Sequence, residues 1–322
     1  MAVPAGTFLT FTAIGNREDL SDVIYNISPT ETPFMSNIPR VGASAVYHEH
    51  QTDALAAAAS NRVVEGDDAT SPGHSPTTRI GNYCQISDKV IRVSGTQRAV
   101  VSAGRADEYS YQTSKAGQEL KRDMEYALVR NQASSSGGAA TARSLASVES
   151  WLSTNRTSAG TGTAQTTPGF SSGVVAAPTD STVAGAFTEG HLQTVISECW
   201  DQGGDPTVVM VGKFNKQAVS GFPGIATQYR DNPQVGQATI IGAADVYVSD
   251  FGTFNVVPNR FMRDQTALVL DMDYWALAEL RSMEITPLAK TGDSDQAQLL
   301  CEYTLESRNE AASGKISDLT TA

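Results

Sequence analysis

The sequence has little charge and few of the side chains on which enzyme sites depend. Charged residues make up 18% of the 322 residues, below the ~25% of an average soluble domain, and histidine occurs four times. The low charge hints that other subunits cover part of the surface. The motifs GxGxxG, GxxxxGK[ST], GxSxG and HExxH are all missing. These absences disfavour an enzyme and give no catalytic residue or cofactor site.

Paired cysteines and long apolar runs are also missing. Cys84, Cys199 and Cys301 lie far apart without a CxxC motif, which predicts free thiols in a reducing cytoplasm. No apolar stretch approaches the ~20 residues that span a bilayer, and the N-terminus does not resemble a signal peptide. We therefore expect a soluble intracellular protein without a membrane partner.

The chain has no basic cluster. Its formal net charge is −12 and its pI is near 4.8, whereas a protein that grips DNA needs clustered Lys and Arg to displace counterions. If nucleic acid lies nearby, the chain is therefore better suited to containing it than to binding it.

The first hundred residues predict an arm and an unusually long hairpin. Prolines 29, 33 and 39 favour extended backbone over residues 1–40. Residues 44–52 and 79–93 alternate as strands do. The polar segment 53–78 between them is far longer than an ordinary hairpin loop. Because a lone two-stranded hairpin is marginal in water, we expect it to find support on a neighbouring subunit.

Residues 105–132 form the strongest predicted helix, ~40 Å long at 1.5 Å per residue. A second helix is predicted at 141–152. The Ser-, Thr- and Gly-rich tract 153–187 is typical of a flexible loop between regions, and mixed helices and strands follow from 188 onward. The fold class is therefore α+β. The buried face of the long helix is predicted to consist of apolar residues at four-residue spacing: Ala116, Leu120, Met124 and Leu128.

Three short patterns mimic functional sites. His48 and His50 face one side of a strand, and His74 or the acidic cluster Glu65, Asp67 and Asp68 could add a ligand, but solvated histidines are far more common than zinc sites. Asp271 and Asp273 fit solvated turn charges equally well. VMVGKF lacks the hydroxyl of a phosphate loop and is interpreted as the turn after a strand. We therefore predict no metal site.

Seven stretches, taken together, resemble one family in its own order. They include NREDLSDVIYNISPTETPFMSNI at 16–38 and HQTDALAAAASNRVVEGDDAT at 50–70. The others are 77–97, 119–132, 206–222, 245–262 and 299–320. This series is similar to the SU-10-like major capsid proteins of tailed phages and covers nearly the whole chain.

The resemblance implies the Hong Kong 97 capsid fold, with the chain divided among its parts. The arm takes 1–40, and the extended loop with adjoining peripheral strands takes 41–98. The peripheral domain with its spine helix takes 99–187, the axial domain 188–290, and 291–322 returns to the peripheral domain. Two departures limit what is carried over. The type phage cross-links its subunits through an extended-loop Lys, but 53–78 contains none. The short stretch before the first matching block predicts a separate scaffolding protein.

The resemblance also implies the function. We expect hexamers and pentamers that close into an icosahedral or prolate phage head around double-stranded DNA, together with a scaffolding protein, a portal and possibly a decoration protein. An encapsulin-like compartment or an unrecognised cytosolic enzyme are the alternatives. Within the loop the predicted assembly contacts are Asp53, Leu55, Arg62, Glu65, Asp67 and Asp68.

Overall fold

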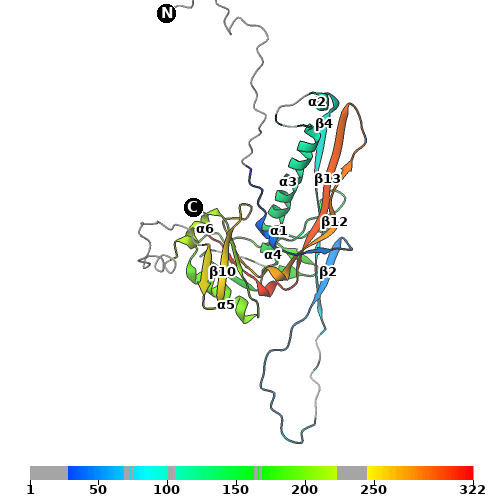
Figure 1. Ribbon diagram of the computed structural model, residues 1–322. Coiled ribbons are helices and arrows are strands. Elements are labelled where there is room, and N and C mark those ends of the chain that lie inside the picture. The colour runs from blue at the N-terminus through cyan, green and yellow to red at the C-terminus, as the bar shows by residue number, and fades with distance from the viewer. Residues whose placement is uncertain are drawn as a thin grey trace, which may run out of the picture.

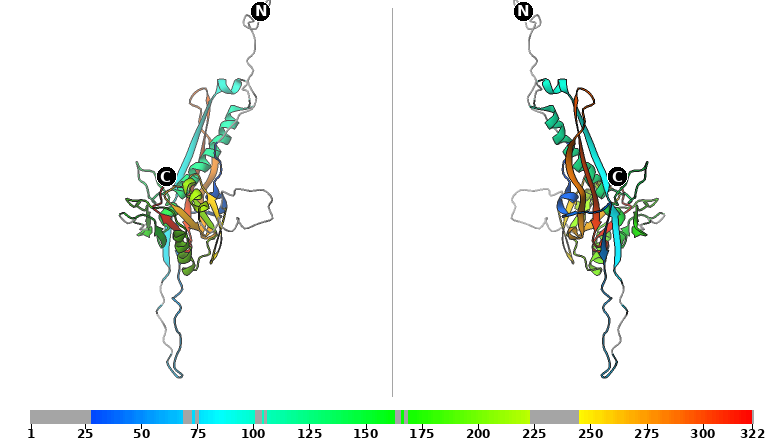
Figure 2. Two further views of the ribbon diagram at one scale, coloured as in Figure 1. Left: turned by 90° about the vertical axis from the view of Figure 1, so that its left-hand side faces the viewer. Right: turned by 90° about the vertical axis from the view of Figure 1, so that its right-hand side faces the viewer.

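The computed structural model describes residues 28–68, 73, 76–100, 104, 106–162, 166, 169–222 and 245–321. They form an elongated limb, a rounder body and a long projecting loop (Figure 1). The limb and the loop extend in opposite directions from the centre of the molecule (Figure 2). Helices and strands alternate along the chain, which confirms the α+β class. Most of the predicted arm, residues 1–27, lies outside the described residues.

The limb is a four-stranded sheet with one long helix packed against it. Strand β13 lies between β12 and β4 and is antiparallel to both, and the short β1 pairs in parallel with β12. At ~3.3 Å per residue, the 14 residues of β13 span about 45 Å. The elements of the limb are β1 (Arg40–Gly42), β4 (Gln85–Ser94), β12 (Trp275–Pro287), β13 (Ser294–Ser307), α2 (Gly95–Ala99) and α3 (Glu108–Val129).

The body is built on a six-stranded mixed sheet in the order β5-β14-β11-β8-β10-β9. Its central strands are apolar on both faces, because a core lies on each side. Val208 and Met210 of β8 belong to the core shared with the limb, while Val209 and Val211 belong to the core under the body helices. The elements are β5 (Asn155–Ser158), β8 (Val208–Val211), β9 (Val246–Ser249), β10 (Gly252–Pro258), β11 (Ala267–Leu270), β14 (Gly314–Ser317), α5 (Glu189–Asp201) and α6 (Lys213–Ser220).

Helix α3 is shorter than predicted because its first turn is capped inside the predicted range. The Asp107 carboxylate accepts hydrogen bonds from the backbone amides of Tyr109 and Ser110 at 3.3 and 3.2 Å, so the helix begins at Glu108. Its 22 residues give a length of about 33 Å. The predicted apolar face is buried, with exposed fractions of 6% or less at all four positions: Ala116, Leu120, Met124 and Leu128.

The proline-rich segment contains a short helix, α1 (Pro33–Asn37), where extended backbone was predicted. Pro33 is compatible with it because a proline at the first helical position loses no hydrogen bond. The Glu125 carboxylate, from α3, accepts the amides of Phe34 and Met35 at 2.8 Å each. A tertiary contact therefore stabilises a helix that local propensity does not predict.

Three further predictions of local structure were wrong. The helix predicted at 141–152 is limited to α4 (Val148–Trp151). The strand at 79–93 divides at Cys84 into β3 (Thr78–Tyr83) and β4, which join different sheets. The tract 153–187 contributes β5 to the body sheet, and the described part also contains the hairpin of β6 (Gly169–Ser171) and β7 (Val174–Ala176). Backbone pairing with distant strands orders a segment whose composition predicts a flexible loop.

The sheets do not follow the predicted domain ranges. Strand β12 lies within 188–290, predicted as axial, yet it belongs to the limb sheet. Strand β14 lies within 291–322, predicted as a return to the periphery, yet it belongs to the body sheet between β5 and β11. The chain crosses between limb and body at η1 (Met272–Tyr274) and again at η2 (Glu310–Ala312).

The buried face of α3 makes the first prediction. Leu120→Asp puts an unpaired carboxylate at a position with 0% exposure, which should lower the free energy of unfolding by at least ~3 kcal/mol. Gln118→Asp, at an exposed position of the same helix, is the matched control. Soluble yield and urea unfolding would measure the difference. A stable, soluble Leu120→Asp subunit would contradict the packing of α3.

Candidate assembly site: the extended hairpin and its anchor

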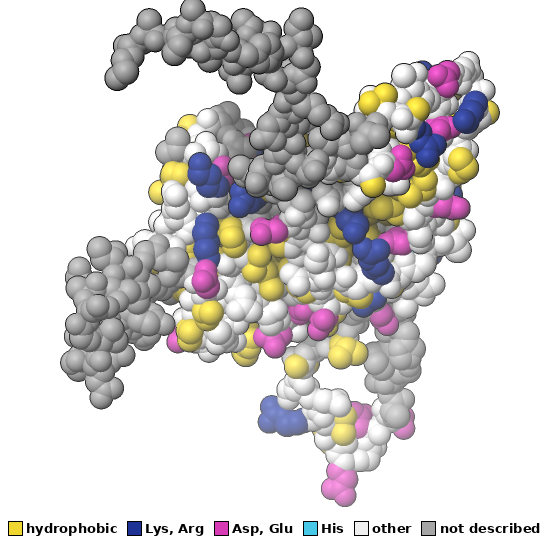
Figure 3. Space-filling view, turned by 45° about the horizontal axis from the view of Figure 1, so that its top comes forward, with side chains coloured by type: hydrophobic (Ala, Val, Ile, Leu, Met, Phe, Trp, Pro, Cys, Tyr) yellow, Lys and Arg dark blue, Asp and Glu magenta, His cyan; other side chains and the backbone are white. Residues whose placement is uncertain are grey.

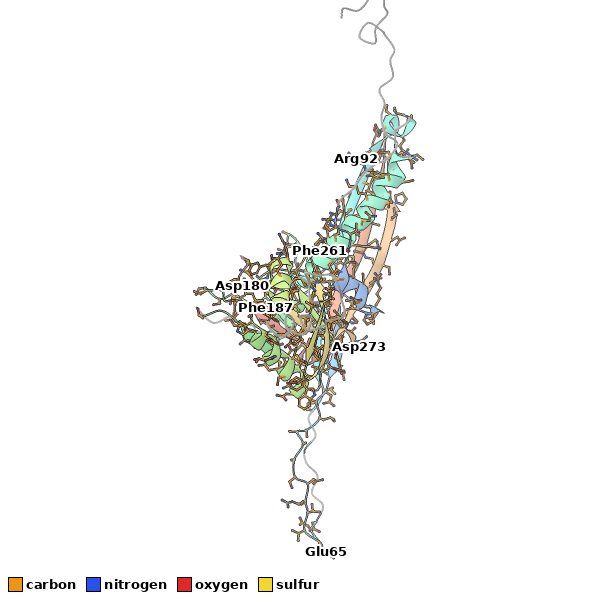
Figure 4. All side chains as sticks on the ribbon, turned by 60° about the vertical axis from the view of Figure 1, so that its left-hand side comes forward. Glu65, Arg92, Asp180, Phe187, Phe261 and Asp273 are labelled. Carbon is orange, nitrogen blue, oxygen red and sulfur yellow. The ribbon has the colours of Figure 1, made fainter. Side chains whose placement is uncertain are left out.

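The loop between β2 (Tyr47–Thr52) and β3 projects far beyond the rest of the subunit. The two strands pair from Tyr47 opposite Tyr83 to Thr52 opposite Thr78, and beyond that pair the described residues of the loop form no strand. Every residue from 53 to 68 is exposed. Figure 4 shows Glu65 at the far end of the loop and Arg92 near the opposite end of the molecule, on the limb. The hairpin thus presents a long stretch of backbone to other molecules.

The tip is a tight turn with mixed chemistry. The Asp67 amide donates to the Val64 carbonyl at 3.2 Å, and Gly66 has a φ of +85°, which an L side chain rarely adopts. All six predicted contact residues are exposed, with Leu55 at 99%. Apolar and charged side chains lie close together on the loop in the space-filling view (Figure 3).

Sequence reasoning missed two apolar residues at the tip. Val63 and Val64 are 80% and 76% exposed, although burial of an aliphatic side chain of this size contributes ~1.5 kcal/mol or more. The signal was present as an adjacent apolar pair within an otherwise polar segment. An exposed apolar tip without cover from its own chain is typical of a surface that another molecule covers.

The base of the hairpin is fixed to the end of β13 by both histidines of β2. His48 Nε2 lies 2.7 Å from Glu306 Oε2, and His50 Nε2 donates to the Ser307 carbonyl at 2.8 Å. Because Ser307 offers only an acceptor, His50 must carry its proton on Nε2. The two histidines do face one side, as predicted, and their partners are a carboxylate and a carbonyl.

Each carboxylate oxygen of Glu306 has its own partner, His48 at Oε2 and Arg308 at Oε1. Its hydrogen bond with His48, assisted by the Arg308 guanidinium at 3.0 Å, lowers the pKa of Glu306 from 4.5 to about 2. Burial lowers the pKa of His50, whose Nδ1 has no partner among the described residues. At neutral pH Glu306 is therefore ionised, and the lowered pKa of His50 favours its neutral form.

The second strand of the hairpin is fixed by a buried amide. Asn82 Nδ2 donates to the carbonyls of Ala146 and Leu305 at 3.1 and 2.9 Å, and its Oδ1 accepts the Ala146 amide at 2.8 Å. At Gly81 a Cβ would lie 2.7 Å from the His48 carbonyl oxygen, so a side chain there would force the strands apart. Both strands are thus held at the base, and the direction of the loop is set there.

The patterns that mimic catalytic sites have structural roles. Gly212 and Lys213 form the turn from β8 into α6, as predicted. Asp271 caps η1 by accepting the Asp273 amide and also accepts the Asp205 amide, both at 3.3 Å. His74 lies outside the described residues. Within the described ranges, no three His, Cys, Asp or Glu side chains are grouped as metal ligands, and no helix is long and apolar enough to cross a membrane.

Comparisons with known proteins decide the family. The sequence model of the SU10 major capsid protein matches residues 3–320. The chain belongs to the SU10 major capsid protein family. The major capsid protein of Escherichia phage Phieco32 is 24% identical over 351 residues, covering 95% of each chain. This chain is therefore a structural protein of the phage head and part of the virion.

Solved capsids share the fold at low sequence identity. The capsid of the native GTA particle matches with a TM-score of 0.65 and 10% identity, covering 97% of this chain and 98% of that one. The capsid asymmetric unit of cyanophage A-1(L) gives the same TM-score and coverage at 13% identity. The predicted Hong Kong 97 capsid fold is confirmed. As a capsid protein the chain assembles with copies of itself into capsomers.

The anchor of the capsid protein's loop makes the second prediction. Because the folded pKa of Glu306 is depressed, its contribution to stability is fully present above pH 4.5 and is lost as the pH falls toward 2. The stability difference between wild type and Glu306→Gln should therefore shrink across this interval. Chemical unfolding at several pH values measures it, with Glu284→Gln, an exposed carboxylate on β12, as control. A difference independent of pH would contradict the ion pair.

Proposed function

We propose that this capsid protein forms hexamers and pentamers in which each extended loop lies over the neighbouring subunit. The carrying observation is the loop itself: its described residues from 53 to 68 are all exposed, while its base is fixed. Ordering a residue's backbone costs ~1–2 kcal/mol, so a loop of this length needs contacts from outside its own chain. A neighbouring copy is the partner that a shell provides at every position.

The predicted contact residues fit a lateral interface. The loop carries four acidic residues, Asp53, Glu65, Asp67 and Asp68, together with Arg62. Exposed ion pairs contribute ~0–1 kcal/mol each. Apolar Leu55, Val63 and Val64 would supply most of the affinity, because interface energy is concentrated in a few desolvated anchors. The charges would then select the register in which the loop docks.

The limb and the body correspond to the two predicted capsid domains. We assign the limb, with α3 as spine helix, to the peripheral domain and the body to the axial domain. Support comes from their shapes: the limb is long and thin, whereas the body is compact (Figure 1). Under this assignment β12 and β13, which belong to the limb sheet, would be peripheral and β14, which belongs to the body sheet, would be axial.

The shell also needs partners of other kinds. A separate scaffolding protein, a portal and possibly a decoration protein would complete the head, and double-stranded DNA would fill it. With a net charge of −12, the subunit would enclose DNA by exclusion and geometry, without specific contacts.

Removal of the loop separates folding from assembly. Replacing 53–76 by Asn-Gly, a favoured two-residue hairpin turn, should leave a folded subunit whose melting temperature changes by less than ~4 °C, since ~1 kcal/mol shifts it by ~2–4 °C at this size. Shells should fail to form, as followed by sedimentation and electron microscopy with the scaffolding protein present.

A full-length control tests which part of the loop matters. Leu55→Ser/Val63→Ser/Val64→Ser keeps the loop's length and its charges, so weak or unstable shells would assign the affinity to the apolar tip. Unfolding of the trimmed subunit would contradict the proposal by placing the loop in the subunit's own core. Stable shells from the trimmed subunit would show that the interface lies elsewhere on the subunit.

DNA binding gives a further test. Purified subunits should bind duplex DNA only weakly and without sequence preference, because binding by counterion release needs a basic face. Fluorescence anisotropy with a labelled duplex, at low salt and at physiological salt, measures this. Tight binding that persists at physiological salt would contradict enclosure without contact.

A further inference from the structure

A second exposed apolar surface lies on the body. Trp200, Val248 and Phe251 are 59%, 72% and 40% exposed, and the rings of Trp200 and Phe251 are 5.5 Å apart. The exposed carboxylates Asp201 and Asp250 lie beside them in the sequence. These five residues are called the body patch. They join the end of α5 to the turn between β9 and β10, beside a groove of about 640 Å³.

The patch adjoins an edge strand of the body sheet, as far as the described residues form it. Strand β9 is the last strand of the body sheet. Asn255 of β10 is paired with Val246 of β9. Its backbone amide points away from β9 and donates a hydrogen bond to the Thr207 carbonyl at 2.8 Å. Val246 and Asn255 are therefore a non-hydrogen-bonded pair, and the peptide groups of Val246 face outward. A sheet edge with outward-facing peptide groups beside exposed aromatic side chains is a surface suited to docking.

The two ends of this sheet carry opposite charge. From Glu189 to Asp205 and from Val246 to Pro258, the sequence has five acidic residues and no Lys or Arg. Asp245 lies instead beside Val256, toward the other end, and pairs with Lys216 at 3.0 Å. Beyond the other end of β8 and β10, where Val211 pairs with Pro258, stand the exposed cations Lys213 and Arg260. Neither forms an ion pair with another residue of the described part of the chain. These two cations are called the basic end.

The geometry separates the patch from the basic end by the length of β10. Its seven residues span about 23 Å at ~3.3 Å per residue. Helix α6 lies at one end of β10 and α5 reaches toward the other (Figure 1). A subunit of this shape cannot bring its own two ends together, but two copies placed head to tail can.

We propose that the body patch of one subunit docks on the basic end of the next copy around a capsomer. Rotational rings need heterologous contacts, in which two different faces of the same chain meet. The patch and the basic end meet this requirement through opposite charge, with Trp200 and Phe251 as desolvated anchors. The inference rests on the proposed ring assembly and specifies which faces join.

Charge reversal gives a test with an internal control. Asp201→Lys/Asp250→Lys makes both faces cationic, and Lys213→Glu/Arg260→Glu makes both faces anionic. Each variant should remain folded, because all four side chains are exposed, but capsomer formation should fall at least tenfold. The quadruple variant, with both faces exchanged, should recover most assembly because opposite charges meet again.

Mixing the two double variants sharpens the test. One variant has two cationic faces and the other has two anionic faces, so opposite charges meet only where the two variants are neighbours. The two kinds of subunit must therefore alternate around a ring. Native mass spectrometry should find hexamers recovered and pentamers absent, since an odd ring retains one repulsive contact. Two results would overturn the proposed docking. One is recovery of hexamers and pentamers to the same extent in the mixture. The other is that the mixture forms neither ring and the quadruple variant also fails to assemble.

A second measurement applies if a charge-reversed variant does not fold, and it distinguishes the proposed ring assembly from the proposed docking faces. If a reversed variant fails to fold by circular dichroism, Asp201→Asn/Asp250→Asn replaces it, and capsomer formation should lose most of its salt dependence. Unchanged salt dependence would overturn the docking faces. Wild-type subunits that form no rings would instead contradict the proposed function, and assembly of all charge variants at wild-type levels would contradict only this inference.

Discussion

The whole limb depends on the pairing of β13 with a strand on each side. The described part of the limb consists of one sheet with the helices α2 and α3, and β13 (Ser294–Ser307) forms ladders with β12 and β4 along most of its length. Its side chains Leu299 and Cys301 are buried in the core that α3 shares. Its last residues, Glu306 and Ser307, hold the base of the hairpin. One strand thus transmits the orientation of the limb to the loop.

Buried carboxylates connect segments that are distant in the sequence. Glu125 ties α1 to α3 and accepts Asn259 Nδ2 at 2.7 Å. Burial raises the pKa of Glu125, although three donated hydrogen bonds oppose that shift. Glu302 binds Arg143 and Arg281 at 2.6 and 2.9 Å. Because an unpaired charge is costly in a low dielectric, each carboxylate allows one arrangement of its partners and so fixes how the segments meet.

Another such centre joins the tract 153–187 to the body. Arg263 binds Glu149 and also Asp180, at 2.8 Å in the second case. Burial alone would lower the pKa of Arg263, but its hydrogen bonds with Asp180 and the charge of Glu149 raise it. Folding is therefore secured by charges inside the subunit, whereas the surfaces proposed for assembly, the loop tip and the body patch, combine exposed apolar groups with unpaired charges.

The sequence by itself determined the family, the α+β class, the long helix with its buried face and the oversized hairpin, because periodicity and segment length are local properties. It also indicated that the histidines of β2 share a face. Only the tertiary structure decided what they bind, since Glu306 lies 258 residues from His48. It likewise decided that Cys84 divides two strands, that α1 is helical and that the tract 153–187 is ordered. Each of these outcomes depends on partners that are distant in the sequence. The energy of contact with those partners exceeds the local conformational preference of the segment, and the composition of the segment does not reveal it.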